Sequence, residues 1–192
     1  NPVPTWYQPF EEKINKGKGK NFDLYAVAQR PPHMYHSWGS QNAWLRQITN
    51  LNYLYISEYI SQENNLKNLD WVWLESFSSK IKVQCRVMKG VNKNTVWTWN
   101  AIGKRKGAWA LDENAPEATK GFLLNHLIHE LQPPKGDGLR WANSDPVTGQ
   151  AAWFDLRVRI EKVPPPKGSQ PNFAALKSPV GKGPSELKWK VG

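Results

Sequence analysis

The segment Leu24–Ile48, LYAVAQRPPHMYHSWGSQNAWLRQI, decides which fold we expect for this sequence. It begins with an apolar run over Leu24–Ala28, which predicts a buried strand. The run breaks at Gln29-Arg30-Pro31-Pro32, because a proline has no N–H for a strand ladder and restricts the residue before it. A polar and aromatic loop over residues 33–42 follows, and then a short helix with one apolar face made by Trp44, Leu45 and Ile48.

The loop places an Arg, two His and a Ser-Trp-Gly-Ser-Gln-Asn run directly after a buried strand. Such a collection is typical of a ligand-binding edge, because loops on a rigid scaffold carry many binding side chains. If the loop stood alone, a solvated surface turn would be the better interpretation. Motifs further along the chain favour the ligand-binding edge.

Five motifs follow one another along the chain. The first is Arg30 at the end of the strand, with His36-Ser37 a few residues later. The others are LKNLDWV over Leu66–Val72, TWNAIG over Thr98–Gly103, EATKGFLLNHLIHEL over Glu117–Leu131, and NSDPVTG over Asn143–Gly149 followed by the run Trp153–Lys162.

In this order the motifs resemble the C-terminal domain of the molybdopterin oxidoreductases, the dimethyl sulfoxide reductase family. They look most like its branch of sulfite dehydrogenases and thiosulfate or polysulfide reductases. The resemblance covers Asp23–Val163, and Leu69 stands where the family has a Gly.

The resemblance implies a β-rich α+β fold: a six-stranded double-psi β-barrel with flanking helices and extended terminal arms. Periodicity alone predicts only a mixed, β-rich domain. The expected parts are an extended arm over residues 1–22, the molybdopterin-dinucleotide-binding barrel over 23–163, and a tail rich in Pro, Lys and Gly over 164–192.

Local patterns predict the other elements. Ser57 is expected to cap a helix over residues 58–64. Alternation predicts a hairpin of strands over 71–76 and 80–88, joined by the turn at 77–79. The remaining expectations are strands over Thr95–Trp99 and Trp153–Val163, a helix over Glu117–Leu131 ended by Pro133-Pro134, and a loop over Leu139–Gln150.

The net charge of +10 and the 11 Trp among 192 residues favour an anionic or planar partner. Many lysines lie at the two ends, over residues 12–20 and 164–190, so the excess describes the ends more than a site. A second hypothesis therefore stays open: a basic, aromatic-rich module that binds single-stranded nucleic acid without a cofactor. A Cys-rich cluster motif early in the full polypeptide would favour the oxidoreductase.

No catalytic or metal-binding set is recognisable in the sequence. Cys85 is the only cysteine, so no disulfide can form within the chain, and its alternating surroundings predict a buried, inert thiol. No nucleophile–base pair or carboxylate cluster is evident, and His126 and His129 are expected to have structural roles. We therefore expect no catalytic residue, no metal ligand and no redox activity in the isolated chain.

The resemblance implies that the chain closes over a bis(pterin guanine dinucleotide) cofactor, which holds Mo or W in the full-length enzyme. Guanidinium and hydroxyl groups suit its pyrophosphates, amides suit its ring edges, His36 suits a pterin nitrogen and Trp38 suits stacking. Arg30, His36, Ser37 and Asn143 are implied by the motifs. The other candidates are Gln29, Trp38, Ser40, Gln41, Asn42, Asn100 and Gln150.

In this family the metal ligand and the iron–sulfur cysteines come from earlier domains, so a 4Fe–4S cluster is expected only there. The start at Asn1 without Met is expected of a fragment of a longer polypeptide. The expected partners are the preceding domains, a membrane anchor subunit, and an iron–sulfur subunit for electron transfer. Direct nucleic-acid binding and direct membrane insertion are not expected.

The expected substrate is an inorganic sulfur compound such as sulfite. The expected location is the bacterial cytoplasm or the cytoplasmic face of the inner membrane, with the periplasm as an alternative.

Overall fold

The computed structural model of the chain describes residues 22–49, 51–100, 102, 122–128, 131–134, 140–142, 148–151 and 156–165. These residues fall into two compact units. The barrel unit contains residues 22–28, 54–98, 124–128 and the described residues from 131 to 164. The loop unit contains residues 29–49, 51–53, 99, 100, 102, 122, 123 and 165.

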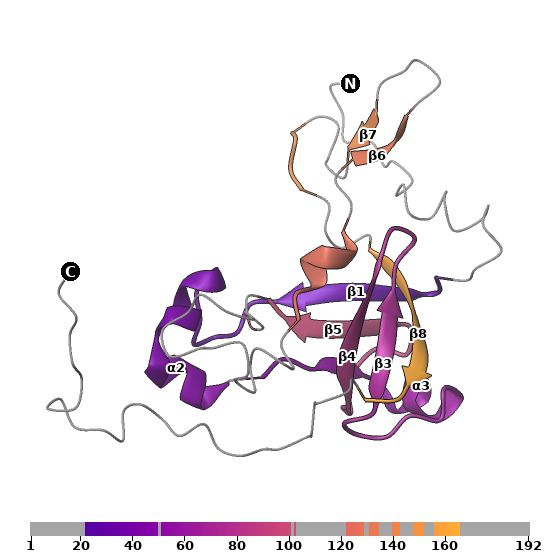
Figure 1. The fold of residues 1–192 in the computed structure, drawn as a ribbon, viewed down its shortest axis with the longest axis horizontal. Coiled ribbons are helices and arrows are strands. Elements are labelled where there is room, and N and C mark those ends of the chain that lie inside the picture. Colours follow the sequence, from indigo (N-terminus) through magenta and orange to yellow (C-terminus); the bar gives the residue numbers. More distant parts are fainter. Residues whose placement is uncertain are drawn as a thin grey trace, which may run out of the picture. The chain divides into compact units, whose positions relative to one another are not determined.

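Six strands close into a barrel in the order β1-β5-β2-β4-β3-β8 (Figure 1). They are β1 (Leu24–Gln29), β2 (Leu54–Ile56), β3 (Trp71–Glu75), β4 (Lys80–Val87), β5 (Thr95–Trp99) and β8 (Arg157–Val163). The pairing is mixed, because β2 runs parallel to β4 while β3 runs antiparallel to both β4 and β8. The closed six-stranded barrel expected from the resemblance is confirmed.

Alternation along the strands separates the barrel interior from its outer face. Leu54 and Ile56 of β2, Val72 and Leu74 of β3, and Val83, Val96 and Val158 of the neighbouring strands are fully buried. Between them on β3, Trp73 and Glu75 are only half-buried. Each of these buried side chains contributes about 1.5–3 kcal/mol relative to an exposed position.

The hairpin expected over residues 71–88 is confirmed as the antiparallel pair β3–β4, with Trp71 opposite Gln84 and Glu75 opposite Lys80. Its turn begins at Ser76, which is buried and donates from Oγ to the Leu127 carbonyl at 2.8 Å. The Ser78 hydroxyl donates to the same carbonyl at 3.1 Å. The turn is thereby attached to a segment that lies far away in sequence.

The helix expected after Ser57 is also confirmed. It is α3 (Glu58–Glu63), and the Ser57 Oγ accepts a hydrogen bond from the Ile60 N–H at 3.1 Å. Such a cap satisfies one of the N–H groups that have no partner within the helix.

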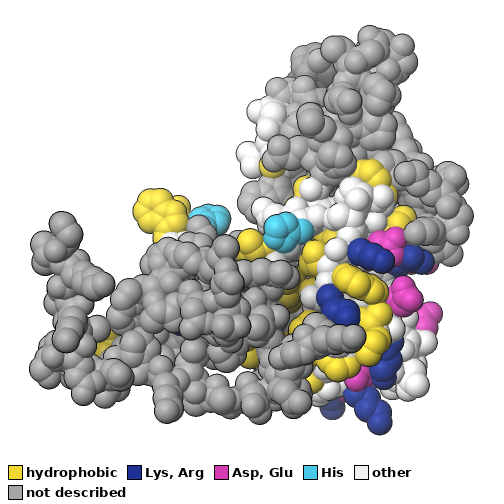
Figure 2. All heavy atoms as spheres, viewed as in Figure 1, with side chains coloured by type: hydrophobic (Ala, Val, Ile, Leu, Met, Phe, Trp, Pro, Cys, Tyr) yellow, Lys and Arg dark blue, Asp and Glu magenta, His cyan; other side chains and the backbone are white. Residues whose placement is uncertain are grey.

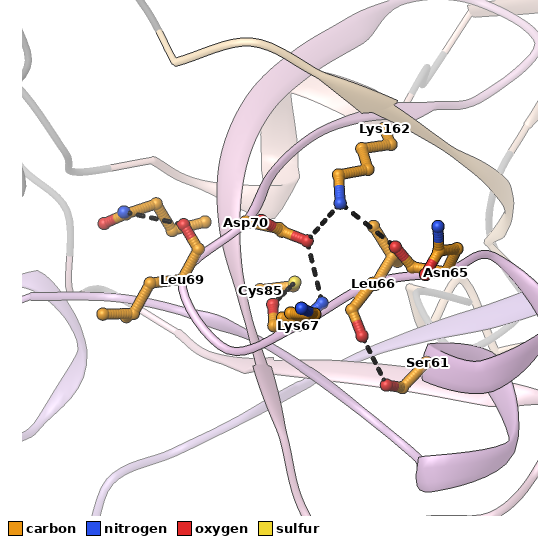
Figure 3. A network of polar contacts seen from close by, with 9 residues as sticks. Ser61, Asn65, Leu66, Lys67, Leu69, Asp70, Cys85 and Lys162 are labelled. Carbon is orange, nitrogen blue, oxygen red and sulfur yellow. Dashed lines mark hydrogen bonds and ion pairs between the residues drawn. The ribbon is translucent and has the colours of Figure 1, made fainter.

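A turn over residues 65–70, the Asp70 turn, connects α3 to β3 (Figure 3). Asp70 Oδ2 accepts from the Lys67 N–H at 2.8 Å and pairs with Lys162 Nζ at 2.7 Å. Leu69 has a φ of +69°, in the left-handed region that favours glycine, and it is the residue that replaces the family Gly. Its N–H donates to the Cys85 carbonyl at 2.8 Å, so β4 holds Leu69 in this conformation.

The helix predicted over Glu117–Leu131 is wrong where that range is described. Residues 124–127 form one turn of 3₁₀ helix, η2 (Leu124–Leu127), and Leu131 begins strand β6 (Leu131–Pro134), which pairs with β7 (Arg140–Ala142) inside the predicted loop. Leu124 and Leu127 are buried, as the predicted apolar face requires. The helical turn ends where hydroxyls of Ser76, Ser78 and Ser79 bind the carbonyls of His126 and Leu127, which a longer helix would use for its own hydrogen bonds.

The predicted terminal arm and tail lie almost wholly outside the described residues, and their bounds stay predictions. Across the part of the chain that is described, no helix combines the length and hydropathy that crossing a bilayer requires.

Candidate functional site

The loop that follows β1 gathers several predicted site residues around Tyr35. The guanidinium carbon of Arg30 lies 5.9 Å from the centre of the Tyr35 ring. The rings of His36 and Trp38 stand edge-on to Tyr35, with centroids 4.9 and 6.2 Å from it. Tyr35 and Trp38 are 60% and 76% exposed. This Tyr35 cluster (Arg30, Tyr35, His36 and Trp38) presents a cation, an imidazole and flat rings on one accessible loop.

His36 has a φ of +46° and begins the 3₁₀ helix η1 (His36–Gln41). This left-handed conformation is uncommon for a residue with a side chain. The turn at His36 therefore depends on the loop around it. Ser37, Ser40 and Gln41 also lie on η1, but their side chains are not described.

The second feature of the loop unit is Asn100, which directly follows β5. Its N–H donates to the Gln29 carbonyl at 2.7 Å, so the ends of β1 and β5 bring two predicted site residues together. Its side-chain Oδ1 is buried and has no hydrogen-bond partner within the described part of the chain. A buried acceptor without a donor costs about 1–3 kcal/mol, so this oxygen is suited to a donor from beyond the described residues, such as a bound ligand.

His33, also in the loop unit, carries a second such atom. Its Nε2 is buried and without a hydrogen-bond partner among the described residues. An imidazole nitrogen can donate or accept according to its tautomer. The imidazole of His33, the guanidinium of Arg30 and the amide oxygen of Asn100 fit a ligand that has phosphates and ring edges bearing N–H groups.

Asn52 fixes the turn that carries Asn100. The Asn52 side chain is 1% exposed, and its Nδ2 donates to the carbonyls of Trp99 at 2.9 Å and Ile102 at 2.8 Å. Its Oδ1 accepts from the N–H groups of Tyr53 at 3.1 Å and Trp99 at 3.3 Å. Asn52 was not among the predicted residues. The one signal that could have found it is a lone amide in the apolar run from Leu51 to Ile56.

Asn42 has a structural contact that competes with its predicted role. Its Oδ1 accepts from the N–H groups of Trp44 at 2.9 Å and Leu45 at 3.4 Å, and so caps helix α2 (Ala43–Ile48). The expected apolar face of this helix is not buried in the chain, because Trp44 and Ile48 are 65% and 66% exposed. The buried residue of α2 is Arg46.

The positions of two other predicted residues relative to this group stay predictions. Gln150 is exposed, belongs to the barrel unit, and donates from its N–H to the Thr148 Oγ1 at 3.3 Å. Asn143 lies outside the described residues.

Charged and hydrophobic side chains are interleaved on the outer face of the barrel (Figure 2). Lys80 and Lys82 lie over the ring of Trp73, with Nζ 4.8 and 5.5 Å from its centre. Arg159 binds Oε2 of Glu75 at 2.6 Å. Each of these three cations therefore has an aromatic or carboxylate partner within the barrel.

The Cys85 thiol is buried, as expected. Burial, together with the negative charge of Asp70, raises the pKa of Cys85 to about 11, so the thiol stays protonated at neutral pH. Among the described residues, no group of three or more His, Cys, Asp or Glu side chains is arranged to hold a metal ion.

Known proteins that are similar to this chain include the two described next. It is 47% identical over 193 residues to a sulfite dehydrogenase subunit of Allochromatium vinosum, in an alignment that covers the whole chain but only 20% of that protein. The matched part is its C-terminal part. The structure of acetylene hydratase from Pelobacter acetylenicus shares the fold with a TM-score of 0.60 at 14% identity, over 84% of this chain and 21% of that one. No family model matches the sequence.

Proposed function

We propose that this chain, a homologue of the C-terminal part of a sulfite dehydrogenase subunit and thus a member of the molybdopterin oxidoreductases, is the cofactor-binding domain of such an enzyme. The ligand is the bis(pterin guanine dinucleotide) that holds Mo or W. The observation that carries the proposal is the loop unit, where Arg30 and the buried oxygen of Asn100, which has no partner among the described residues, follow the ends of two adjacent barrel strands.

Each residue has a role that its chemistry and exposure support. The exposed guanidinium of Arg30 binds a pyrophosphate oxygen with a charge-assisted hydrogen bond. Asn100 Oδ1 accepts from a ring N–H, and the exposed indole of Trp38 stacks on a base. When bound, the metal centre supplies the two-electron chemistry. The residues of this chain bind and orient the ligand that carries it.

The whole enzyme is proposed to oxidise or reduce an inorganic sulfur compound, with sulfite as the first candidate because of the relative's name. The chain spans a fifth of that relative's length, so the metal ligand and the iron–sulfur cluster are assigned to other domains. The exposed side chains of Tyr35, Trp38, Trp44 and Ile48 form the surface expected to face those domains or the cofactor. An iron–sulfur subunit and a membrane anchor complete the proposal, with a location in the bacterial cytoplasm or at the cytoplasmic face of the inner membrane and the periplasm as the alternative.

The test is Arg30→Ala in the full-length enzyme, with Mo or W and guanine nucleotide measured per polypeptide. Loss of a charge-assisted hydrogen bond costs about 1.5–3 kcal/mol, which weakens cofactor binding on the order of 10- to 150-fold. The thermal midpoint of the apoprotein should not change, because Arg30 is exposed.

The matched control is Lys89→Ala, which removes an exposed cation just after β4. It should leave both the cofactor content and the thermal midpoint unchanged. Full cofactor loading of the Arg30→Ala enzyme would contradict the assigned phosphate contact. A wild-type enzyme that contains no pterin dinucleotide would contradict the proposed function itself.

A further inference from the structure

We infer that Asn52 is the positioning residue for the cofactor contact of Asn100, an inference that rests on the proposed function. Asn52 lies at the point where the loop unit meets the start of β2 in the sequence, and its side chain is 1% exposed. It makes no contact with the ligand in this scheme. It acts by fixing the backbone on both sides of Asn100.

The hydrogen bonds of Asn52 show how it does so. The side-chain amide pairs with the Trp99 backbone as a neighbouring strand would. Its Nδ2 donates to the Trp99 carbonyl, and its Oδ1 accepts from the Trp99 N–H. The second proton of Nδ2 is directed to the Ile102 carbonyl at 2.8 Å. Trp99 and Ile102 lie before and after Asn100, so one buried side chain fixes both flanks of that residue.

The same amide also reaches a more distant part of the chain. Nδ2 lies 3.4 Å from the Phe122 carbonyl, its longest hydrogen bond. Ile102 and Phe122 stand at the two ends of the undescribed segment 103–121. Asn52 therefore links the residues on both sides of Asn100 to Phe122, the first described residue after that segment.

Only a short side chain with both a donor and an acceptor can make this set of bonds. Aspartate retains the acceptor but directs a second oxygen at the carbonyls of Trp99, Ile102 and Phe122. Leucine, of similar size, provides neither a donor nor an acceptor. Glutamine carries the same amide on a longer stem. The bonds leave Asn100 with its N–H on the Gln29 carbonyl and its Oδ1 buried, without a partner in the described part of the chain, so the acceptor is already oriented before a ligand arrives.

The experiment is a double-mutant cycle in the full-length holoenzyme, with Asn52→Asp and Asn100→Ala made singly and together. The measured quantity is the rate at which guanine nucleotide and metal are released in urea too dilute to unfold the protein. We expect each single variant to release the cofactor about 3- to 10-fold faster, the effect of losing one hydrogen bond. The double variant should release it no faster than Asn100→Ala alone, because Asn52 acts through Asn100.

The cycle is repeated with Asn52→Gln, which keeps the amide and changes only its reach. This second variant keeps the test decisive if the aspartate variant does not fold. Asn52→Gln should release cofactor more slowly than Asn52→Asp does. Combined with Asn100→Ala, it should release cofactor no faster than Asn100→Ala alone.

Multiplicative effects of the two substitutions would overturn the inference, because they would show that Asn52 stabilises the fold independently of Asn100. Failure of both Asn52 variants to fold would overturn it as well. In either case a wild-type enzyme that carries the cofactor would leave the proposed function standing. A wild-type enzyme without the cofactor would refute the proposed function and remove the basis of the inference.

Discussion

Asp70→Asn tests whether the Asp70 turn stabilises the barrel through charge or only through shape. In the structure one carboxylate oxygen, Oδ2, accepts from both the Lys67 N–H and Lys162 Nζ (Figure 3). The asparagine carbonyl oxygen has the same position available and can accept both hydrogen bonds. The substitution therefore removes the negative charge and retains the geometry of the turn.

The magnitude follows from the exposure of the pair. The side chains of Lys162 and Asp70 are 46% and 26% exposed, so solvent screens their attraction. We expect Asp70→Asn to lower the free energy of unfolding by about 0.5–1 kcal/mol, the range for such ion pairs. Asp70→Ala also removes the acceptor for the Lys67 N–H, and its cost should rise to about 1.5–2.5 kcal/mol.

The effect should depend on pH in a definite direction. Burial raises the pKa of Asp70, but the hydrogen bonds from Lys162 and from the Lys67 N–H outweigh it and hold that pKa below its ordinary value of 3.8. Since the folded-state pKa is depressed, the stabilising contribution is complete above the ordinary value. It is lost as the pH falls through the lowered folded-state pKa.

The assay is equilibrium urea unfolding of the 192-residue chain, followed by tryptophan fluorescence at several pH values from 7 down to 3. The gap between wild type and Asp70→Asn should be largest at pH 7 and should narrow as the pH approaches and passes 3.8. Glu63→Gln, which removes an exposed carboxylate from α3, is the matched control and should show no such gap. A gap of equal size at pH 7 and pH 3 would refute the charge argument.

Two further outcomes are expected. Cys85 of the native chain should react with iodoacetamide at pH 8 on the order of 100-fold more slowly than in the urea-unfolded chain, because its raised pKa leaves little thiolate; equal rates would show that the thiol is accessible. Ser76→Ala and Ser78→Ala together should destabilise the barrel by more than the sum of the single effects, reaching about 2 kcal/mol, since the Leu127 carbonyl then loses both hydroxyl donors. Simple additivity in urea unfolding would contradict this shared role.

The elements that could be predicted from the sequence are those with local causes. The β3–β4 hairpin follows from alternating side chains and a short polar turn, and α3 follows from a serine placed before a helical run. The strand Thr95–Trp99 has the predicted bounds. Each of these signals is contained in a few adjacent residues, so no knowledge of the rest of the fold was needed.

The predicted helix over Glu117–Leu131 shows where local signals fail. The spacing of Leu124 and Leu127 is compatible with a helix, and both side chains are buried. The helix is limited to one turn by the serines after β3, whose hydroxyls bind the last carbonyls of η2. These serines lie 47 to 51 positions away in the sequence. A propensity for helix is weak and is overridden by such tertiary bonds.

The sequence predicted the β3–β4 hairpin and the strand Thr95–Trp99, the family that the motifs resemble, and Arg30 and Asn100 as candidate ligand contacts. It did not determine that the Asn100 amide oxygen is buried and has no partner among the residues that the structure describes, or that Asn52 holds the turn around it. Asn52 and Trp99 are 47 positions apart, and their hydrogen bonds exist only when the two segments are brought together by folding. The partners of a buried polar side chain are set by distant parts of the chain, whereas alternation and capping are set by neighbours, and this is why only the tertiary structure decided the arrangement of the site.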